Sequence, residues 1–244
     1  MSLLLLKSFR KLAVFLFALI LTVLYVNYEV SAKEYNPRQD SFVFFRVNNG
    51  EMKIALSFDD GPHPTKTDKI LDILEKYNVK ATFFMVGSQA EFCPDTAKRV
   101  ASLGHEIGNH THNHKSLAKL SEAELDREIT LAESAITEAC GYIPSLFRPP
   151  EGVCTEKIAD AAKYRGYNIV MWSVDTLDWK GRSGAEIAAD VEKQVHPGCV
   201  ILMHDGIFRT AHTDEALDIL IPRLMSLGYE FVTVGELISE RCAE

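Results

Sequence analysis

Residues 54–64 read Ile54-Ala55-Leu56-Ser57-Phe58-Asp59-Asp60-Gly61-Pro62-His63-Pro64, and this stretch decides how the chain folds. Its apolar half is typical of a buried strand, which the following glycine and prolines would end. Two adjacent carboxylates stand at the exit of that strand. Neighbouring carboxylates repel each other unless a cation is bound, so the pair indicates a metal held by one aspartate, with the other free as a base. An ordinary solvated turn is the alternative.

The composition is that of a globular protein with one sizeable core. Of the 244 residues, 47% are hydrophobic and 25% are charged. The formal net charge is -8 and no basic stripe is visible, which argues against a nucleic-acid partner. The five cysteines form no C-x-x-C pair, and the sequence leaves their disulfide pairing open.

The first 32 residues have the pattern of an export signal. Lys7, Arg10 and Lys11 precede an uncharged apolar run over residues 12–26, and small residues follow at 31–32. The pattern predicts a signal peptide, with an uncleaved membrane anchor as the alternative. In either case we expect the protein to be exported: secreted, associated with the cell wall or anchored in the membrane. Residues 33–52 are predicted to be a linker and lead-in to one domain over residues 53–244.

From Lys53 onward, strand-like and helix-like segments alternate in seven units. The predicted strands are Ile54–Phe58, Ala81–Val86, Glu106–Gly108, Leu146–Arg148, Ile169–Ser173, Val200–Met203 and Glu230–Val234. Such alternation indicates parallel strands joined by right-handed crossovers. Seven units suit a distorted (β/α)7 barrel, an incomplete relative of the eight-stranded barrel, and an open doubly wound sheet is the alternative. The barrel is favoured because the chemically suggestive residues all follow strands, as at the C-terminal end of such barrels.

Two histidines after the third predicted strand have the spacing of metal ligands. His110 and His114 are four residues apart, so one helical turn would place both imidazoles on the same face. His112 would then point away, and His105, which lies before the strand, is assigned a structural role. A solvated histidine-rich loop is the alternative.

Later strands also end at polar residues. Arg148 is followed by two prolines that fix its backbone, and it could pair with Asp59. Asp175 could hold a catalytic histidine in one tautomer, and Trp179 could wall a pocket or stack on a sugar ring. Four apolar residues bring His204 to the end of the sixth strand. Each residue alone also fits a structural role, so the joint pattern carries the argument.

Together these segments resemble the polysaccharide deacetylase family, which is also known as the NodB-homology domain or carbohydrate esterase family 4. The resemblance covers the chain from about Lys53 to the C-terminus. The five motifs of the family occur in order as Ser57-Phe58-Asp59-Asp60-Gly61-Pro62, His110-Thr111-x-x-His114, Arg148-x-Pro150-x-Gly152, Asp175-x-x-Asp178-Trp179 and Leu202-x-His204.

The resemblance implies a divalent metal held by Asp60, His110 and His114. Zinc is the usual metal in the family, and cobalt, nickel and manganese also suit two histidines and one aspartate. It implies further that Asp59 is the general base and that His204 is the general acid, which would protonate the departing amine.

The resemblance also assigns supporting roles. Arg148 would orient Asp59, and Asp175 would tune His204. The substrate-binding residues would be Trp179 and Leu202, which line a pocket for the acetyl methyl group, together with Pro150. Glu151 departs from the common family pattern and would make the groove wall more acidic.

The expected reaction is the hydrolysis of N-acetyl groups on N-acetylglucosamine-type residues of a glycan polymer, with release of acetate. Export favours peptidoglycan as the substrate, with chitooligosaccharides second. Two alternatives remain: a hydrolase of small cyclic amides or imides on the same fold, and an inactive module that binds cell-wall glycans.

Overall fold

A computed structural model describes residues 35–47, 50–206 and 212–241. The export signal predicted for residues 1–32 lies outside these described residues. Residues 37–244 belong to one compact unit. None of the helices in the described ranges combines the length and the apolar character needed to cross a bilayer.

Strands and helices alternate along most of the chain. The strands are β1 (Val43–Phe44), β2 (Lys53–Asp59), β3 (Thr82–Met85), β4 (Glu106–Asn109), β5 (Leu146–Phe147), β6 (Asn168–Val170), β7 (Val174–Asp175), β8 (Val200–His204) and β9 (Glu230–Phe231). The α-helices are α2 (Lys66–Lys76), α3 (Gly87–Phe92), α4 (Pro94–Ser102), α5 (Glu122–Cys140), α6 (Glu156–Tyr164), α7 (Gly184–Gln194), α8 (Thr213–Ser226) and α9 (Val234–Arg241). Short 3-10 helices are η1 (Pro37–Gln39), η2 (Leu117–Lys119), η3 (Pro150–Gly152) and η4 (Asp178–Lys180).

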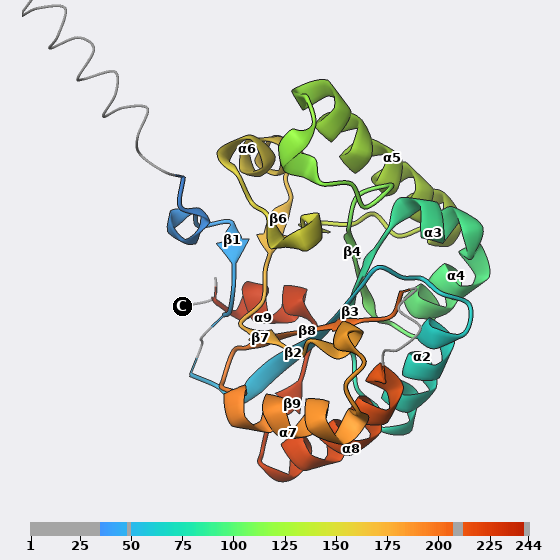
Figure 1. The fold of residues 1–244 in the computed structure, drawn as a ribbon, viewed down its shortest axis with the longest axis vertical. Coiled ribbons are helices and arrows are strands. Elements are labelled where there is room, and N and C mark those ends of the chain that lie inside the picture. Colours follow the sequence, from blue (N-terminus) through green and yellow to red (C-terminus); the bar gives the residue numbers. More distant parts are fainter. Residues whose placement is uncertain (1–34, 48–49, 207–211, 242–244) are drawn as a thin grey trace, which may run out of the picture. The chain divides into compact units, whose positions relative to one another are not determined.

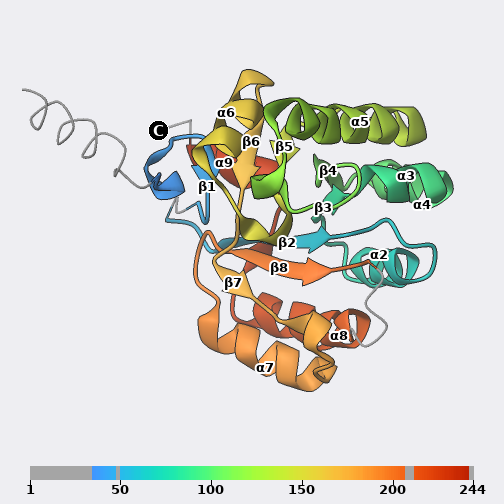
Figure 2. The same ribbon diagram turned by 45° about the horizontal axis from the view of Figure 1, so that its top comes forward.

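The strands form one curled parallel sheet (Figure 1). Their order is β1-β6-β5-β4-β3-β2-β8-β7, and β9 pairs with the start of β2. Helices α5, α3 with α4, α2, α8 and α7 follow one another around the sheet (Figure 2). The predicted incomplete barrel is therefore confirmed, because the sheet curls without closing between β1 and β7.

Two short segments span the opening of the curl. Residues 171–173 alone connect β6 to β7, although these strands lie near opposite edges of the sheet. Such a link reaches at most roughly 14 Å, so the edges must approach each other. In the lead-in, Arg46 forms an antiparallel bridge with Cys199, and the N–H of Val47 donates to the carbonyl of Gly198 at 2.8 Å. The half-barrel is thereby held in its curled form.

Local sequence signals explain the helix ends. Ser121 and Glu124 form a capping box at the start of α5, in which each side chain accepts a backbone N–H of the other residue. The helix ends at Gly141, whose φ of 72° lies in the left-handed region that glycine adopts without strain. A second capping box, Ser183 with Glu186, begins α7.

The sequence reading missed three features of the fold. It overlooked strand β1 in the lead-in and the short helix α3 directly after β3. The predicted strand Ile169–Ser173 is wrong as a single element, because the chain leaves β6 after Val170 and joins β8 as β7 from Val174. The apolar run continues past the end of β6 as far as Trp172, so the sequence pattern gives no sign that the strand ends at Val170.

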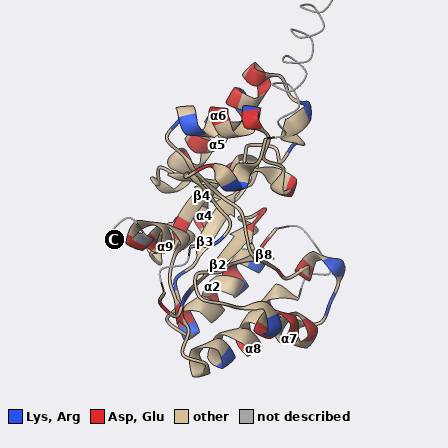
Figure 3. Ribbon diagram, turned by 90° about the vertical axis from the view of Figure 1, so that its left-hand side faces the viewer, with Lys and Arg blue, Asp and Glu red and all other residues tan. Residues whose placement is uncertain are grey.

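The helices carry both acidic and basic residues (Figure 3). Some of them pair across neighbouring helices, as Arg99 of α4 does with Asp68 of α2 at 2.9 Å and Arg223 of α8 with Glu192 of α7 at 2.8 Å. Exposed pairs of this kind contribute about 0–1 kcal/mol each. The stability of the half-barrel therefore rests on its apolar core.

Cys93, Cys140 and Cys199 form no disulfide in the described part of the chain. Cys199 is fully buried just before β8, and burial raises the pKa of its thiol to about 11. The thiol thus stays protonated and serves as a small apolar side chain.

His105 has the structural role that was predicted for it. Its ring is 4% exposed, and its Nδ1 accepts the N–H of Ala81 at 3.2 Å. Burial, helped by the charge of Lys80, lowers the pKa of His105 to about 4. The neutral imidazole therefore stabilises the fold above the unfolded-state pKa of about 6.5, and this stabilisation is lost as the pH falls through 4.

We expect this histidine to contribute roughly 3 kcal/mol to the acid sensitivity of the fold. Urea unfolding of the chelator-treated protein between pH 7 and pH 4 should show a steeper loss of stability for the wild type than for His105→Gln, which retains an acceptor for Ala81. Parallel pH curves for the two proteins would contradict the assignment.

Candidate active site

The register of the sheet brings the predicted catalytic residues to one edge. Asp59 ends β2 and His204 ends β8, and the two are direct partners in the parallel ladder. Arg148 and His110 each follow the last residue of a neighbouring strand, β5 and β4. Because the strands are parallel, all of these side chains emerge at the C-terminal end of the half-barrel.

Asp59 is held by a fully buried arginine. The Nη1 of Arg148 donates to Asp59 Oδ1 at 2.7 Å and to Ser57 Oγ at 3.0 Å. The rest of the guanidinium donates to the carbonyls of Val170 and Met171, each at 3.0 Å. With every side of the guanidinium engaged, the arginine is rigid and fixes the orientation of Asp59. The structure thus pairs the two residues as the sequence suggested.

The turn after β2 directs the next carboxylate to a different place. Asp60 has a φ of 78°, and a Cβ placed on Gly206 would come within 2.4 Å of its side chain. The buried carboxylate of Asp205 holds the turn, since it accepts the N–H of Gly61 at 2.9 Å and the hydroxyl of Thr67 at 2.6 Å. Burial and repulsion by the other two aspartates raise the pKa of Asp205 to about 7. The left-handed backbone of Asp60 turns its carboxylate away from Arg148.

Asp60 meets both predicted histidine ligands. Its Oδ1 lies 3.2 Å from His114 Nε2 and 3.5 Å from His110 Nε2, and the two rings are 5.0 Å apart. The predicted helical turn is wrong, however. Residues 110–114 form a loop in which Thr111 and His114 have φ values of 66° and 51°. The imidazoles converge because the loop doubles back, and helical periodicity plays no part.

The donor set fits a divalent metal. One ligand atom from each of Asp60, His110 and His114 lies within 4.8 Å of the others. His110 Nδ1 lies 2.7 Å from the carbonyl of Arg148, which can only accept, so this nitrogen carries a proton and Nε2 is the nitrogen that could bind a metal. Two imidazoles and one carboxylate match catalytic metal sites that keep a position open.

The general acid predicted from the sequence is oriented by a different aspartate. His204 Nδ1 lies 2.7 Å from Asp178 Oδ1, and Asp178 Oδ2 accepts the N–H of His204 at 2.9 Å and the hydroxyl of Thr213 at 2.7 Å. The expectation that Asp175 tunes His204 is therefore wrong. Asp175 instead accepts the N–H of Leu177 at 3.0 Å. The left-handed Leu177, with a φ of 51°, returns the chain so that the buried Asp178 faces the end of β8.

The environment of His204 favours its protonated form. Burial lowers the pKa of the imidazole, but the hydrogen bond and charge of Asp178, with the charges of Asp59 and Asp60, outweigh it and raise the pKa to about 9. In turn, burial would raise the pKa of Asp178, but the bonds from His204 and Thr213 lower it overall. His204 is thus a proton donor at neutral pH, as a general acid must be.

We expect Asp178→Asn to lower kcat about 10- to 100-fold and to move the alkaline limb of the pH–rate profile to lower pH, because His204 loses the charge that raises its pKa. Asp175→Asn should leave that limb in place. The profiles can be measured by acetate release between pH 5 and 10. A shift in the Asp175 variant alone would contradict the observed pairing.

These residues surround a cavity of about 350 Å³ at the C-terminal end of the half-barrel. The side chains of Trp179 and Leu202 line it, in the positions that the sequence predicted for the acetyl pocket. The sequence reading missed Trp172, which also lines it, and Pro150 does not belong to the lining. Pro150 is buried at the start of η3, so Glu151 and Gly152 face the cavity instead.

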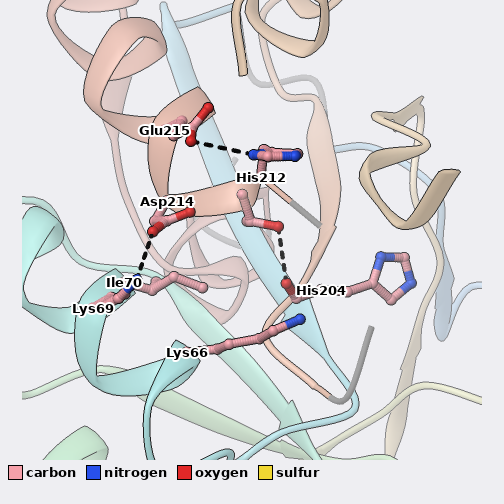
Figure 4. A pocket seen from close by; sticks show the side chains of 8 residues that line it. Lys66, Lys69, Ile70, His204, His212, Asp214 and Glu215 are labelled. Atoms are coloured by element: carbon pink, nitrogen blue, oxygen red, sulfur yellow. Dashed lines mark hydrogen bonds and ion pairs between the residues drawn. The ribbon is translucent and has the colours of Figure 1, made fainter. Parts of the chain in front are cut away.

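A second cavity, of about 220 Å³, lies between the N-terminal turns of α2 and α8. Figure 4 shows that the ring of His204 points away from it. Lys69 pairs with Asp214 at 3.5 Å and His212 with Glu215 at 3.2 Å, so most of its charged lining is already paired. Among the residues that the structure describes, the arrangement of acid, base and candidate metal ligands is found at the first cavity.

Fold and site together define a hydrolase built on a parallel half-barrel with a metal-binding donor set. The chain belongs to the polysaccharide deacetylase family, since the family model described as polysaccharide deacetylase matches residues 46–170.

Named relatives support this membership. The chain is 45% identical over 187 residues to a peptidoglycan-N-acetylglucosamine deacetylase of Bacillus cereus, a match that covers 76% of this chain and 68% of the relative. It is 39% identical over 191 residues to the peptidoglycan-N-acetylmuramic acid deacetylase PdaC of Bacillus subtilis, covering 78% of this chain and 40% of that protein.

Solved structures share the fold. A peptidoglycan N-acetylglucosamine deacetylase crystallised with 4-naphthalen-1-yl-N-oxidanyl-benzamide aligns with a TM-score of 0.79 and 41% identity, over 80% of this chain and 92% of that one. A pseudoenzyme of carbohydrate esterase family 4 from Bacillus anthracis aligns with a TM-score of 0.76 and 29% identity, over 81% and 69% of the two chains. The fold alone therefore does not guarantee turnover, and the site must be judged residue by residue.

Proposed function

We propose that this protein is a metal-dependent N-deacetylase that hydrolyses the acetamide of N-acetylglucosamine residues in peptidoglycan. One observation carries the proposal: the Asp59–Arg148 pair, the Asp60 and histidine cluster and the His204–Asp178 pair line or support a single cavity. The peptidoglycan deacetylases among the relatives support the choice of polymer. Chitooligosaccharides are the second candidate, because a chitooligosaccharide deacetylase of Bradyrhizobium is also among the relatives.

The residues of the site can divide the chemistry among them. Asp59 is held in place by Arg148 and can accept a proton from the attacking water, and His204 can donate a proton to the departing amine. A bound divalent metal would supply Lewis acidity to the amide carbonyl and lower the pKa of water. Leu202 and Trp179 give the acetyl group an apolar wall. The products are acetate and a free amino sugar.

Zinc is our proposed metal, because two imidazoles and one carboxylate suit it and it needs no redox partner. The same donors accept cobalt, nickel and manganese. Metal analysis of the purified protein, followed by reconstitution of the chelated protein with each ion in turn, would identify the metal that supports turnover.

Substrate preference can be tested with defined glycans. The full chain is expected to release acetate from purified peptidoglycan at a higher kcat/KM than from chitooligosaccharides of equal length. Mass spectrometry of the digested products would show whether glucosamine or muramic residues lose the acetyl group. Activity on small cyclic amides with none on either glycan would overturn the proposal.

The pseudoenzyme with the same fold provides the contrasting hypothesis, an inactive module that binds wall glycans. In the present chain, the carboxylate pair, both histidines of the cluster and the acid His204 with its partner are all in place. Glycan binding without acetate release, in protein loaded with metal, would favour the inactive module.

We also propose that the enzyme acts outside the cytoplasmic membrane. The proposal rests on the basic and apolar pattern of residues 1–32 and on a polymer that lies outside that membrane. Fractionation of cells that produce the full chain, with N-terminal sequencing of the mature protein, would separate a cleaved signal from an uncleaved anchor.

A further inference from the structure

The loop that carries His110 and His114 is held on one side by helix α5. Asn109, the last residue of β4, joins the loop to the helix. Its Oδ1 accepts the N–H of Thr111 at 2.8 Å, and its Nδ2 donates to the carbonyl of Ile129 at 2.9 Å. The histidines at the even-numbered positions 110 and 114 meet Asp60. Contacts to α5 therefore help to fix the loop that carries the two histidines.

Glu128 of α5 contacts both residues that flank His114 in the sequence. Its Oε2 accepts the backbone N–H of Asn113 at 2.8 Å, and its Oε1 accepts the Nδ2 of Asn113 at 2.9 Å and the Nζ of Lys115 at 2.8 Å. The carboxylate thus binds the residues on both sides of His114. No step of the proposed reaction uses this glutamate.

Burial and charge indicate that Glu128 is ionised in this place. The side chain is 4% exposed on a helix whose other acidic residues lie nearer the surface. Burial raises the pKa of Glu128, but the bonds from Lys115 and Asn113 outweigh it and lower the pKa overall. A buried carboxylate whose oxygens are all engaged has one rigid arrangement, which suits an anchor.

His114 depends on such an anchor more than His110 does. His110 is buried, and its Nδ1 is bound to the carbonyl of Arg148 at 2.7 Å. The side chain of His114 is 38% exposed, and its backbone has a φ of 51°, a strained conformation for a residue with a side chain. Residues in such conformations keep them only where the surroundings enforce them.

We propose that Glu128 is a positioning residue for metal binding, which fixes the Asn113–Lys115 segment so that His114 reaches the ion bound by Asp60 and His110. The inference rests on the proposed metal centre. Outer residues that orient metal ligands typically change metal affinity 10- to 100-fold when removed. Glu128 would act in this way through the loop backbone, without touching the metal or the substrate.

The test is a Co²⁺ titration of the chelated full chain, followed through the visible absorption of the bound ion. Glu128→Ala should raise the Kd for Co²⁺ about tenfold or more and alter the absorption spectrum, because one imidazole is misplaced. Glu128→Gln retains an acceptor for the N–H of Asn113 and should raise the Kd less. Zn²⁺ affinity, measured by competition with a chromophoric chelator, should follow the same order.

Two variants serve as matched controls. Glu138 lies on the same helix with an exposed side chain, so Glu138→Ala should leave the Kd unchanged. Lys115→Met removes the ion pair on one side of His114 but leaves both bonds from Asn113 to Glu128, so it should raise the Kd less than Glu128→Ala does. If Glu128→Ala shows no cooperative unfolding transition and is therefore not properly folded, Glu128→Gln and Asn113→Ala test the proposal in its place. Each of them removes part of the same set of bonds.

The outcomes distinguish this inference from the proposed function. A wild-type Kd and spectrum in the folded Glu128 variants would overturn the role of Glu128 and leave the deacetylase intact. Failure of the wild type to bind Co²⁺ or Zn²⁺ would overturn the metal centre itself and the inference with it.

Discussion

Replacing Asp59 by asparagine should lower kcat for acetate release by about 10³-fold, since removal of a general base typically costs 10²- to 10⁴-fold. The amide is nearly isosteric with the carboxylate, so the chain should fold, but it cannot accept the proton of the attacking water. It also leaves the buried guanidinium of Arg148 without its anion. Initial rates of acetate release from peptidoglycan, measured with metal at saturation, provide the readout.

The control for this variant is metal binding. Asp60 and the two histidines are untouched in Asp59→Asn, so Co²⁺ should still bind and a loss of rate would report on chemistry. Glu138→Gln, a surface substitution of the same kind, should have the wild-type rate. If Asp59→Asn kept the wild-type kcat, another group would have to be the base.

Replacing one of the two histidine ligands should leave a protein whose activity added metal cannot restore. The chelated wild type is expected to lose more than about 99% of its rate and to recover it on addition of Zn²⁺ or Co²⁺, because the metal supplies several kcal/mol of charge stabilisation in the transition state. His110→Ala should not recover at the same metal concentration, since only Asp60 and His114 would remain as ligands.

His112 provides a control within the same loop. Its Nδ1 is buried beside Gly87 without a hydrogen-bond partner, and it lies outside the metal-binding cluster. His112→Ala should therefore recover with added metal as the wild type does. Recovery of His110→Ala, or failure of His112→Ala alone, would mean that the ligands have been assigned wrongly.

The sequence predicted which residues meet because parallel strands deliver their C-terminal residues to one edge. That rule needs only the position of each strand end, and it brought Asp59, Arg148 and His204 together from widely separated parts of the chain. It does not depend on the conformation of the loops. The candidate metal ligands Asp60, His110 and His114, which the family resemblance implied, also lie together, although the conformation expected for the histidine loop was wrong.

Predictions that depended on loop conformation failed. Asp175 is the last residue of β7 and Asp178 follows shortly after it, and the left-handed Leu177 decides which of them faces His204. The family motif contains both aspartates, so the sequence indicated that Asp178 belongs to the site. It did not indicate that Asp178 is the one that pairs with His204. Pro150 was misplaced for a similar reason, because η3 turns its neighbours toward the cavity.

The pairing of Asp59 with His204 in the β2–β8 ladder has a consequence for the engineering of this enzyme. The spacing between the proton acceptor and the proton donor is set by the interstrand distance of about 4.8 Å and by the backbone hydrogen bonds of the sheet. Cavity-lining residues such as Trp179 can then be changed singly to accept other glycans, as long as the adjacent Asp178, which holds His204, is kept. A one-residue insertion within either strand would instead turn one partner to the opposite face and separate the two proton transfers.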